Sequence, residues 1–481
     1  MQKIHDDDPG GFAAIQAKHL MQCWASQRGY RPIPVHRAEG CWIHTSGGRR
    51  IFDLRSAHEC VNLGFNHPAI LEAMRRQMET VVYVTDDFST EPAAALAQRL
   101  AHATPGSPDK KVFFSQSGAA AVEAAIKGAR MFKYNELFRG GGNRAVHAPG
   151  QYPYPYKIVS RYRSWHGSTA GAASASGDPR RWFQEPFTMP GVVFAPDADA
   201  YRPRFGESGD SGDSLDASLA YFDHLIEQEG GNGGVAAVLI EPVVGSNGII
   251  PPPPGYLPAL RALCDRWGIL LIADETMTGM GRTGRFLAVE HFGIEPDIIV
   301  MGKALGAYCP IAATIFSQRV AQSFEDNIFG HGQSFSGHAL ACAAALASVD
   351  IVRDDGFLAR VRSAGARLES KLRALAGNHP SVGDVRGLGL FFTIELVKDR
   401  QTKEPVRKAT EKYSPTIVKA VSEFLLAERD IYVPSDKFGL WVVPPLIVND
   451  EEIDFLADGL DAALDLADRL LKKGTGTAQR P

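Results

Sequence analysis

The chain has 481 residues, of which 44% are hydrophobic and 22% are charged, and its formal net charge is −4 at pH 7. This length exceeds one ordinary core, so we expect a two-part globular protein. The small negative charge, without any basic block, argues against nucleic acid as the main partner. No apolar run has the length of a membrane span, and the acidic N-terminal stretch lacks the apolar core of a secretory signal. We therefore expect a cytoplasmic protein with no membrane partner.

The six cysteines are scattered along the chain without the paired spacing of a zinc site. Free thiols of this kind fit a reducing compartment. The sequence accordingly predicts no metal site.

The N-terminal residues 1–70 combine an irregular arm with a small sheet segment. Residues 40–44 and 50–54 alternate between apolar and polar side chains, as strands do. Residues 68–77 then show the spacing of an amphipathic helix. We expect this helix to lead into a large domain over residues 71–350, with 1–70 forming an arm and part of a smaller domain.

A turn of small residues follows the next predicted strand, at 111–114. The segment SQSGAAA (115–121) leads from this strand into a helix that we expect to end near Met131. The free N–H groups and the positive end of a helix bind phosphate well at such a place. Ser117 can add a hydroxyl donor, although turns of small residues also occur where elements merely pack tightly.

Two stretches have compositions that cannot bury a core and are expected to be surface insertions. Residues 138–156 are rich in Gly, Pro and Tyr, and residues 203–214 are acidic. Between them a strand at 157–160 is followed by Trp165. This aromatic side chain could lie flat on a ligand ring or be an ordinary core residue.

Two apolar runs in the middle of the chain are each followed by one ionisable side chain. The runs at 269–273 and 298–301 have the length of buried strands, and Asp274 and Lys303 follow them. Because parallel strands end at a common crevice, this carboxylate and this amine can address one ligand. Pyridoxal phosphate needs a lysine that holds it as a Schiff base and an acid beside its pyridine nitrogen. The alternative is that Asp274 caps a turn and Lys303 begins a solvated helix.

The remaining segments complete an α/β pattern. A strand at 235–240 is followed by Glu241, and a helix at 257–267 connects it to the next strand as in a βαβ unit. From about Asp355 the pattern changes to helices that alternate with short strands, which is typical of a separate α+β lobe. We therefore predict that residues 351–481 form a C-terminal small domain.

Taken in order, these segments resemble the class III aminotransferases, the ω-amino acid and amine:pyruvate group of fold type I pyridoxal-phosphate enzymes. The resemblance implies an α/β fold, with a mostly parallel seven-stranded sheet in a large domain and a smaller α+β domain formed by both ends of the chain. It covers nearly the whole sequence and is carried by the segments SQSGAAAVEAAIKGAR, SWHGST, EPVVGSNGIIPPPPGY, IADETMTGMGRTG, DIIVMGKALG, GHGQSFSGHALACAAAL and RGLGLFFTIEL.

The resemblance also implies roles for individual residues. Lys303 would form the Schiff base and move the proton between the substrate carbon and the cofactor, and Asp274 would keep the pyridine nitrogen protonated. The loop of Ser334 would reach the phosphate of a partner subunit, which implies a homodimer, with a dimer of dimers left open. The cofactor contacts implied in this way are Ser117, Gly118 and Ala119 at the phosphate, Trp165 and Thr276 on the two ring faces, and His166, Glu241 and Ser334.

Four positions depart from the pattern of the family without removing its chemistry. The phosphate turn usually reads Gly-Ser/Thr-Glu, whereas here Ala119 and Ala120 follow Gly118. Thr276 stands where Val or Ile is usual, and Trp165 where Tyr or Phe is common. The backbone must therefore contribute more to phosphate binding than in most relatives.

Other departures concern the substrate. Ser246 and Trp441 occupy positions at which relatives that use 2-oxoglutarate often carry a glutamate and an arginine. Glu59 replaces a bulky aromatic residue of the small pocket and favours a substrate with a hydroxyl, amide or second amino group, unless it pairs with a nearby arginine. Trp24 and Phe88 lie in stretches that often line the same pocket.

These features predict a ping-pong aminotransferase that moves an amino group from a primary amine or ω-amino acid to a 2-oxo acid, with pyruvate favoured over 2-oxoglutarate. A same-fold aminomutase, racemase or decarboxylase would use Lys303 and Asp274 as well. A non-catalytic assembly subunit is the alternative from a different class. The identity of the amine donor stays open at this point.

Overall fold

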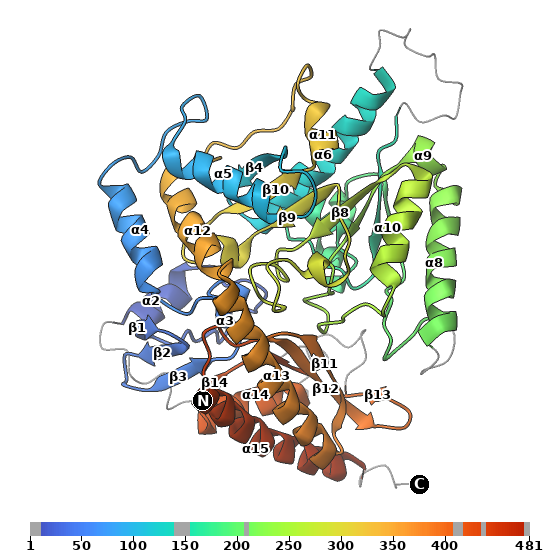
Figure 1. Cartoon of the computed structure of the whole chain (residues 1–481). Helices are drawn as coiled ribbons and strands as arrows, with labels where there is room; N and C mark the ends of the chain where they lie inside the picture. Colours follow the sequence, from blue (N-terminus) through green and yellow to red (C-terminus); the bar gives the residue numbers. More distant parts are fainter. Residues whose placement is uncertain (1–10, 139–153, 206–210, 407–416, 434–438, 476–481) are drawn as a thin grey trace. The chain divides into compact units, whose positions relative to one another are not determined.

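The computed structural model describes residues 11–138, 154–205, 211–406, 417–433 and 439–475, without the side chains of 211–214 and 473–475. The chain forms two compact units (Figure 1). We call Met1–His67 with Val361–Pro481 the terminal unit, and Pro68–Arg360 the central unit. Within the described ranges, no helix is both long and apolar enough to cross a bilayer.

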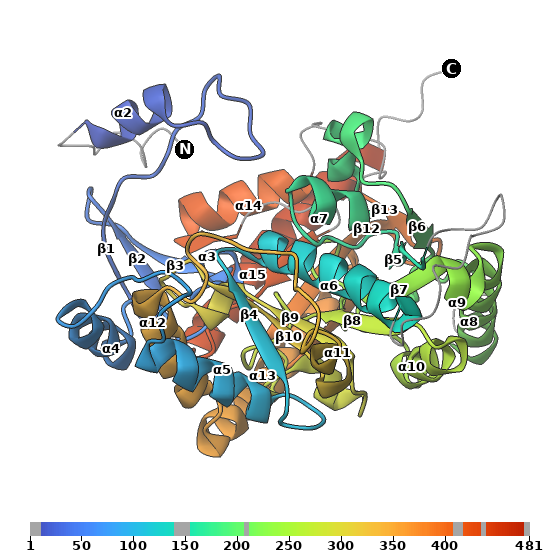
Figure 2. The ribbon, with the colours of Figure 1, turned by 90° about the horizontal axis from the view of Figure 1, so that it is seen from above.

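The central unit is built on a seven-stranded sheet with the order β4-β10-β9-β8-β7-β5-β6 (Figure 2). Strand β10 runs antiparallel to both of its neighbours and the other pairs are parallel, so the predicted mostly parallel sheet is confirmed. The inner strands are buried at every position, which explains their continuous apolar runs. The strands are β4 (Lys111–Ser115), β5 (Lys157–Arg161), β6 (Val192–Ala195), β7 (Val235–Ile240), β8 (Leu270–Asp274), β9 (Ile298–Met301) and β10 (Ala312–Phe316).

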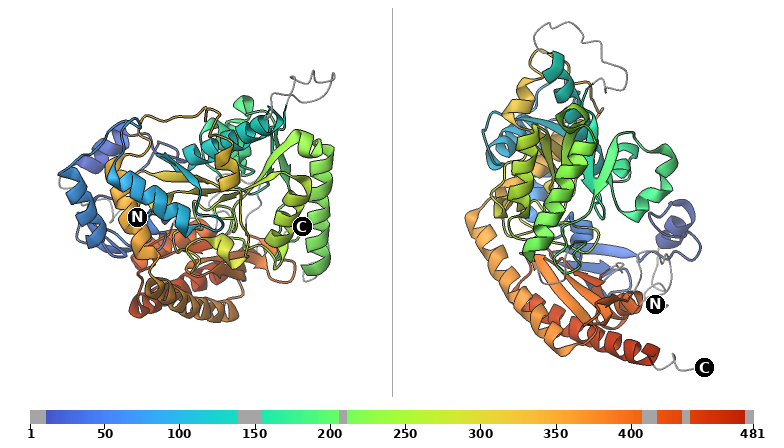
Figure 3. Two further views of the ribbon diagram at one scale, coloured as in Figure 1. Left: turned by 45° about the horizontal axis from the view of Figure 1, so that its top comes forward. Right: turned by 90° about the vertical axis from the view of Figure 1, so that its right-hand side faces the viewer.

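Helices pack on this sheet and on one another. A buried apolar cluster joins α6 to strands β5 and β7 to β10, and α8 and α10 run side by side (Figure 3). The longer helices are α4 (Pro68–Met78), α5 (Glu91–Ala103), α6 (Gly118–Phe138), α8 (Ser211–Gln228), α10 (Tyr256–Trp267) and α12 (Ala339–Val352), and the shorter ones are α7 (Ala170–Ala175), α9 (Gly231–Gly234) and α11 (Gln318–Gln322).

Two predictions about helix boundaries in this unit were wrong. Helix α6 continues seven residues beyond Met131, to Phe138, because no Gly or Pro interrupts the sequence before Gly140 and Phe132 still packs into the core. The acidic stretch 203–214 is not all loop, because α8 begins at Ser211, where Ser and Asp residues favour a helix start. Residues 206–210 of that stretch, and 139–153 of the other expected insertion, lie outside the described residues.

The terminal unit combines both ends of the chain. One sheet has the order β1-β2-β3-β14, in which Ile431 of β14 pairs in parallel with Phe52 of β3. A second sheet contains β11, β12, β13 and β15. The elements are α2 (Phe12–His19), β1 (Val35–Glu39), β2 (Trp42–Thr45), β3 (Arg50–Asp53), α3 (Ser56–Glu59), α13 (Asp355–Asn378, entering from the central unit), β11 (Val382–Leu388), β12 (Phe391–Asp399), β13 (Glu404–Pro405), α14 (Ile417–Glu428), β14 (Ile431–Tyr432), β15 (Gly439–Val442) and α15 (Asp450–Thr475).

Candidate active site

The loops that carry the predicted cofactor residues leave the sheet at one edge. Strand β4 is parallel to β9, because each is antiparallel to β10, so β4 ends at the same edge as β5, β7, β8 and β9. We call this the carboxyl edge. It brings together loops of the central unit, as expected for a binding crevice in an open α/β sheet. The first candidate residues of these loops are Ser117, Trp165, Glu241, Asp274 and Lys303.

Asp274 ends β8 and is held by two bonds. Its Oδ2 lies 2.8 Å from Nδ1 of His166, and its Oδ1 accepts the backbone N–H of Thr276 at 3.0 Å. Asp274 and His166 are both buried. Within the described part of the chain, the second ring nitrogen of His166, Nε2, is buried without a hydrogen-bond partner. Hydrogen bonds thus hold the Asp274–His166 pair in place, but the His166 Nε2 atom is left without a hydrogen bond among the described residues.

Glu241 fixes the loop that contains Trp165 and His166. Its buried carboxylate accepts the backbone N–H of Trp165 at 3.0 Å and that of Gly245 at 2.9 Å. Burial raises the pKa of Glu241; nearby His166 lowers this pKa, and the charge of Asp274 raises it. Because Glu241 bonds to backbone groups of two loops, its role in this structure is to position them.

Two glycines allow the loops after β4, β8 and β9 to meet closely. A Cβ atom on Gly118 would lie 2.8 Å from the methyl carbon of Thr276, and one on Gly302 would lie 3.2 Å from it. The Thr276 hydroxyl is buried and, among the described residues, has no hydrogen-bond partner. Gly118 and the segment before Lys303 are therefore neighbours of Thr276.

The phosphate turn predicted from the sequence is a helix start in the structure. The Ser117 hydroxyl accepts the backbone N–H of Ala120 at 3.2 Å, so this side chain caps α6. Ala119 touches the neighbouring loop, since a Cβ on Gly167 would lie 2.4 Å from the Ala119 Cβ. The first N–H groups of an α-helix have no acceptor within the helix and point out of its end.

Lys303 lies at the end of β9 in an unusual backbone conformation. Its φ is +48°, in the left-handed region, within a short 3₁₀ turn (Lys303–Leu305). For a residue other than glycine this conformation costs about 1–2 kcal/mol. Such conformations persist where the surroundings impose them and are often found at functional sites.

Trp165 is partly buried and one of its faces carries a cation. The guanidinium carbon of Arg180 lies 3.7 Å from the Trp165 ring centroid. Asp178 accepts the Arg180 Nε–H at 2.9 Å and holds the guanidinium in place. Sequence reasoning missed this pairing, because Arg180 lies in a connection between strands without a recognisable motif.

The candidates for substrate binding fall in both units. In the central unit, the Ser246 hydroxyl lies 3.7 Å from the sulfur of Met277, and Phe88 is exposed. Ser334 is also exposed, and its carbonyl accepts the Tyr83 hydroxyl. The contact of Ser334 with a partner subunit stays a prediction.

In the terminal unit, Arg55 contacts two of the substrate-binding candidates, Glu59 and Trp441. The third candidate, Trp24, is exposed. The Arg55 Nε lies 3.2 Å from Oε1 of Glu59, and its guanidinium carbon lies 4.3 Å from the ring centroid of Trp441. Glu59 is 1% exposed. This geometry supports the alternative that Glu59 pairs with an arginine.

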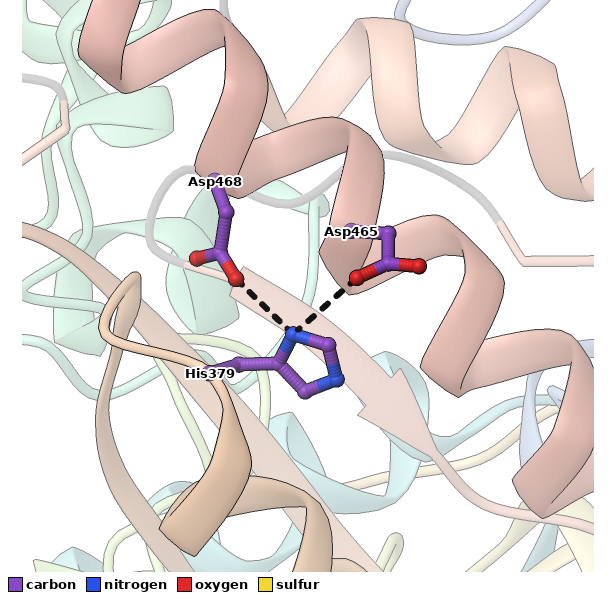
Figure 4. Close-up of side chains that lie close together, drawn as sticks. All are labelled: His379, Asp465 and Asp468. Atoms are coloured by element: carbon purple, nitrogen blue, oxygen red, sulfur yellow. Dashed lines mark hydrogen bonds and ion pairs between the residues drawn. The ribbon is translucent and has the colours of Figure 1, made fainter.

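A second ionisable cluster lies in the terminal unit, around His379 (Figure 4). Nδ1 of His379 lies 2.9 Å from Asp468 and 3.9 Å from Asp465, and its Nε2 lies 3.0 Å from Asp461. Among the described residues, His379, Asp465 and Asp468 are the one group of His, Cys, Asp and Glu close enough to hold a metal ion. Both ring nitrogens are already bonded to carboxylates, so we assign the cluster a structural role.

The sequence matches the family model of the class-III aminotransferases over residues 25–464. The chain belongs to this family. It is 31% identical to the taurine–pyruvate aminotransferase of Bilophila wadsworthia over 95% of this chain and 97% of that protein. Accordingly, it is a pyridoxal-phosphate-dependent aminotransferase of fold type I.

Two solved structures are similar over almost their whole length. A taurine:2-oxoglutarate aminotransferase from Bifidobacterium kashiwanohense, in complex with PLP and glutamate, has a TM-score of 0.87 and 32% identity, with 96% of this chain and 98% of that chain covered. A thermostable (S)-enantioselective ω-transaminase from Thermomicrobium roseum has a TM-score of 0.85 and 32% identity, with 96% and 99% covered.

The residues at the carboxyl edge fit pyridoxal phosphate. The atoms Nε2 of His166 and Oγ1 of Thr276, which lack partners among the described residues, are polar groups that a bound polar ligand would satisfy. Gly118 leaves room beside Thr276 that a side chain would fill. An amine on a strained turn and a buried carboxylate complete the donor set that this cofactor needs.

Proposed function

We propose that this aminotransferase moves an amino group from a primary amine or ω-amino acid to a 2-oxo acid, with pyruvate as the acceptor, by a ping-pong mechanism. The observation that carries the site assignment is the buried Asp274–His166 pair at the same sheet edge as Lys303. When bound, pyridoxal phosphate supplies an electron sink for the substrate carbon that loses its proton.

The chain's own residues would divide the work among three tasks. The Lys303 amine would hold the cofactor covalently and then carry a proton from the substrate carbon. Asp274 would place a negative charge at the pyridine nitrogen, with His166 keeping its carboxylate oriented. Ser117, Gly118 and Ala119 would bind the phosphate at the start of α6, and Trp165 and Thr276 would enclose the ring.

The preference for pyruvate rests on two substitutions. Ser246 lacks the carboxylate of a glutamate. Trp441 is not a cation but a buried indole, on which the guanidinium group of Arg55 stacks. Neither position offers the arginine–glutamate pair expected of an enzyme that uses 2-oxoglutarate. The similar proteins differ in the acceptor that their names state, pyruvate in one and 2-oxoglutarate in another.

The proposal extends to the amine donor and the assembly. An ω-amino acid or a sulfonate such as taurine is compatible with the names of the similar proteins. We also propose a homodimer in which the exposed loop of Ser334 contacts the partner's cofactor phosphate. Sedimentation of the holoenzyme as a monomer at micromolar concentration would contradict this assembly.

Replacement of Lys303 tests the assignment of the site. Lys303→Ala should remove the visible absorbance of the lysine-bound cofactor and reduce turnover by about 10³-fold or more. Lys398 on β12 offers the control, because it is an exposed lysine of the terminal unit that pairs with Glu404 at 2.8 Å. Lys398→Ala should leave both readouts unchanged, and retention of both in Lys303→Ala would refute the role.

Stopped-flow half-reactions test the acceptor and the reaction class. The cofactor should be aminated faster by alanine than by glutamate, and the opposite order would refute the preference for pyruvate. Amine donor alone should convert the cofactor to pyridoxamine phosphate in stoichiometric amount. A racemase would act without accumulating that form, an aminomutase would convert its substrate to an isomer without a 2-oxo acid, and a decarboxylase would release carbon dioxide.

A further inference from the structure

A fully buried arginine lies behind the cofactor loops, at the last position of β5. Arg161 is 2% exposed, although it ends a strand that is buried at every position. One of its terminal nitrogens, NH2, donates to the backbone carbonyl of Glu241 at 2.6 Å. Its Nε lies 3.9 Å from Oδ1 of Asp197, which follows β6 by two residues. Arg161 therefore connects the ends of three neighbouring strands, β6, β5 and β7.

The connection continues to the predicted cofactor residues. Glu241, whose carbonyl is held by Arg161, uses its carboxylate to hold the backbone N–H of Trp165. The next residue, His166, bonds to Asp274 at 2.8 Å. An unbroken series of contacts thus runs along the carboxyl edge from Asp197 to Asp274. Asp197 itself has no expected contact with cofactor or substrate.

The Asp197–Arg161 pair belongs to a group of buried charges at the carboxyl edge. The buried carboxyl groups here include those of Asp197, Asp199, Glu241 and Asp274. The guanidinium groups that face them are Arg161 and Arg163, and Arg163 is bonded to Asp199 at 2.6 Å. Burial of a cation requires a paired anion, and loss of either member leaves an uncompensated charge.

Burial and the neighbouring arginines have opposite effects on the pKa of Asp197. Burial raises the pKa of Asp197 to about 7, although Arg161 and Arg163 lower it; Glu241 and Asp199 raise it further. The Tyr256 hydroxyl also faces this pair, and burial raises its pKa to about 12, so it stays neutral. Protonation or replacement of Asp197 therefore changes the net charge of the Asp197–Arg161 pair that faces Glu241.

We propose that Asp197 is a positioning residue of the cofactor site, which acts through Arg161 on Glu241 and so sets the placement of Trp165 and His166. The proposal concerns the binding of the cofactor and does not depend on which amine or 2-oxo acid the enzyme uses. It assigns Asp197 and Arg161 a role that the sequence motifs do not indicate.

The test uses the isosteric variant Asp197→Asn and titration of the apoprotein with pyridoxal phosphate in alkaline buffer, where Asp197, whose pKa burial raises to about 7, carries its charge. We expect the dissociation constant of the cofactor to rise about tenfold, by analogy with outer-shell partners at metal sites. The visible circular dichroism of the bound cofactor should decrease, because the ring is held less rigidly. In turnover, kcat should fall while the KM for the amine changes little.

A matched control separates positioning from loss of stability. Asp297 is also paired with a partly buried arginine, Arg261, at 2.7 Å, but it precedes β9 and lies at the opposite edge of the sheet. Asp297→Asn should lower the melting temperature while leaving the cofactor's dissociation constant and dichroism unchanged. The proposal would be refuted if Asp197→Asn, correctly folded, kept both cofactor readouts, or if the two variants changed them equally.

A second variant applies if Asp197→Asn does not fold. Arg161→Lys keeps the positive charge beside Asp197 but removes the planar fork that reaches the Glu241 carbonyl. It should raise the dissociation constant of the cofactor in the same direction as Asp197→Asn. A folded Arg161→Lys protein with unchanged affinity and unchanged dichroism would contradict the proposal. Failure of the proposed acceptor or donor in the half-reactions would leave these binding measurements unaffected.

Discussion

Two histidines of this protein meet aspartates, one in each unit, and their environments differ. His166 of the central unit bonds to Asp274 through Nδ1, while its buried Nε2 has no partner among the described residues. His379 of the terminal unit has a carboxylate on each ring nitrogen, Asp468 on Nδ1, which Figure 4 shows, and Asp461 on Nε2. Asp274 is 4% exposed at its side chain, whereas Asp461 is 52% exposed.

The difference supports the proposal that the Asp274–His166 cluster binds a ligand and that the His379 cluster does not. A buried polar atom without a partner is costly, and a bound ligand that supplies the missing interaction removes this cost. A histidine with a hydrogen-bond partner on each ring nitrogen has no free nitrogen for a ligand. It joins two elements, here the segment after α13 and helix α15. Titratable residues alone would not separate these cases, because both clusters combine His and Asp.

The largest effect that this comparison predicts is on Asp274. Asp274→Asn should keep the fold but slow amination of the cofactor by about 10²–10⁴-fold, because the amide cannot stabilise a protonated pyridine nitrogen. Stopped-flow spectroscopy of the half-reaction measures this rate. Asp468→Asn is the matched control in the other cluster and should leave the rate unchanged. A near-normal rate in Asp274→Asn would contradict the role of Asp274.

The next largest effect concerns stability in the terminal unit. His379→Gln should lower the free energy of unfolding by about 1–3 kcal/mol, since it removes charge-assisted bonds to Asp461 and Asp468. Urea denaturation measures this change, and the affinity for cofactor should not change. If His379→Gln weakened cofactor binding as well, the assignment of a purely structural role would be wrong.

The same cluster predicts a pH dependence. Burial alone would lower the pKa of His379, but the hydrogen bonds of Asp461 and Asp468 outweigh it and raise this pKa above the ordinary value of 6.5. A raised histidine pKa means that the stabilisation is complete below about pH 6.5 and is lost as the pH rises through the pKa of the folded state. The difference in unfolding free energy between the wild type and His379→Gln should therefore shrink in alkaline buffer.

Acid should remove the same stabilisation by a different route. Burial raises the pKa of Asp468, but bonds from Ser381 and His379 outweigh it, so the net pKa is lowered. Stability from a carboxylate of lowered pKa is lost as the pH falls through that pKa. If the difference in unfolding free energy between the wild type and His379→Gln stayed constant from acid to alkaline buffer, His379 would contribute packing alone.

The fold, and the places of Asp274 and Lys303 at strand ends, could be predicted because their signals are local. The apolar runs of β7, β8 and β9 specify buried strands, and Asp274 and Lys303 stand at the ends of two such runs. The roles proposed for Arg161 and Asp197 could not be predicted, because they depend on which strands are neighbours: β6 and β7 flank β5 although they are far apart in sequence. An arginine at the end of a buried strand was the one available signal. The stacking of Arg180 on Trp165 is a tertiary contact of the same kind.

The smallest predicted effect is on stability and compares two buried threonine hydroxyls, one with and one without a hydrogen-bond partner among the described residues. Thr276→Val removes a buried hydroxyl that has no partner among the described residues, so it should stabilise the apoprotein by about 1 kcal/mol. Thr314→Val is the matched control, because the Thr314 hydroxyl donates to the Ala121 carbonyl at 2.8 Å, and its loss should destabilise by about 1–2 kcal/mol. Urea denaturation without cofactor compares them. If Thr276→Val were as destabilising as Thr314→Val, the Thr276 hydroxyl would already be satisfied within the protein, and it would no longer distinguish the cofactor site from a filled cluster such as that of His379.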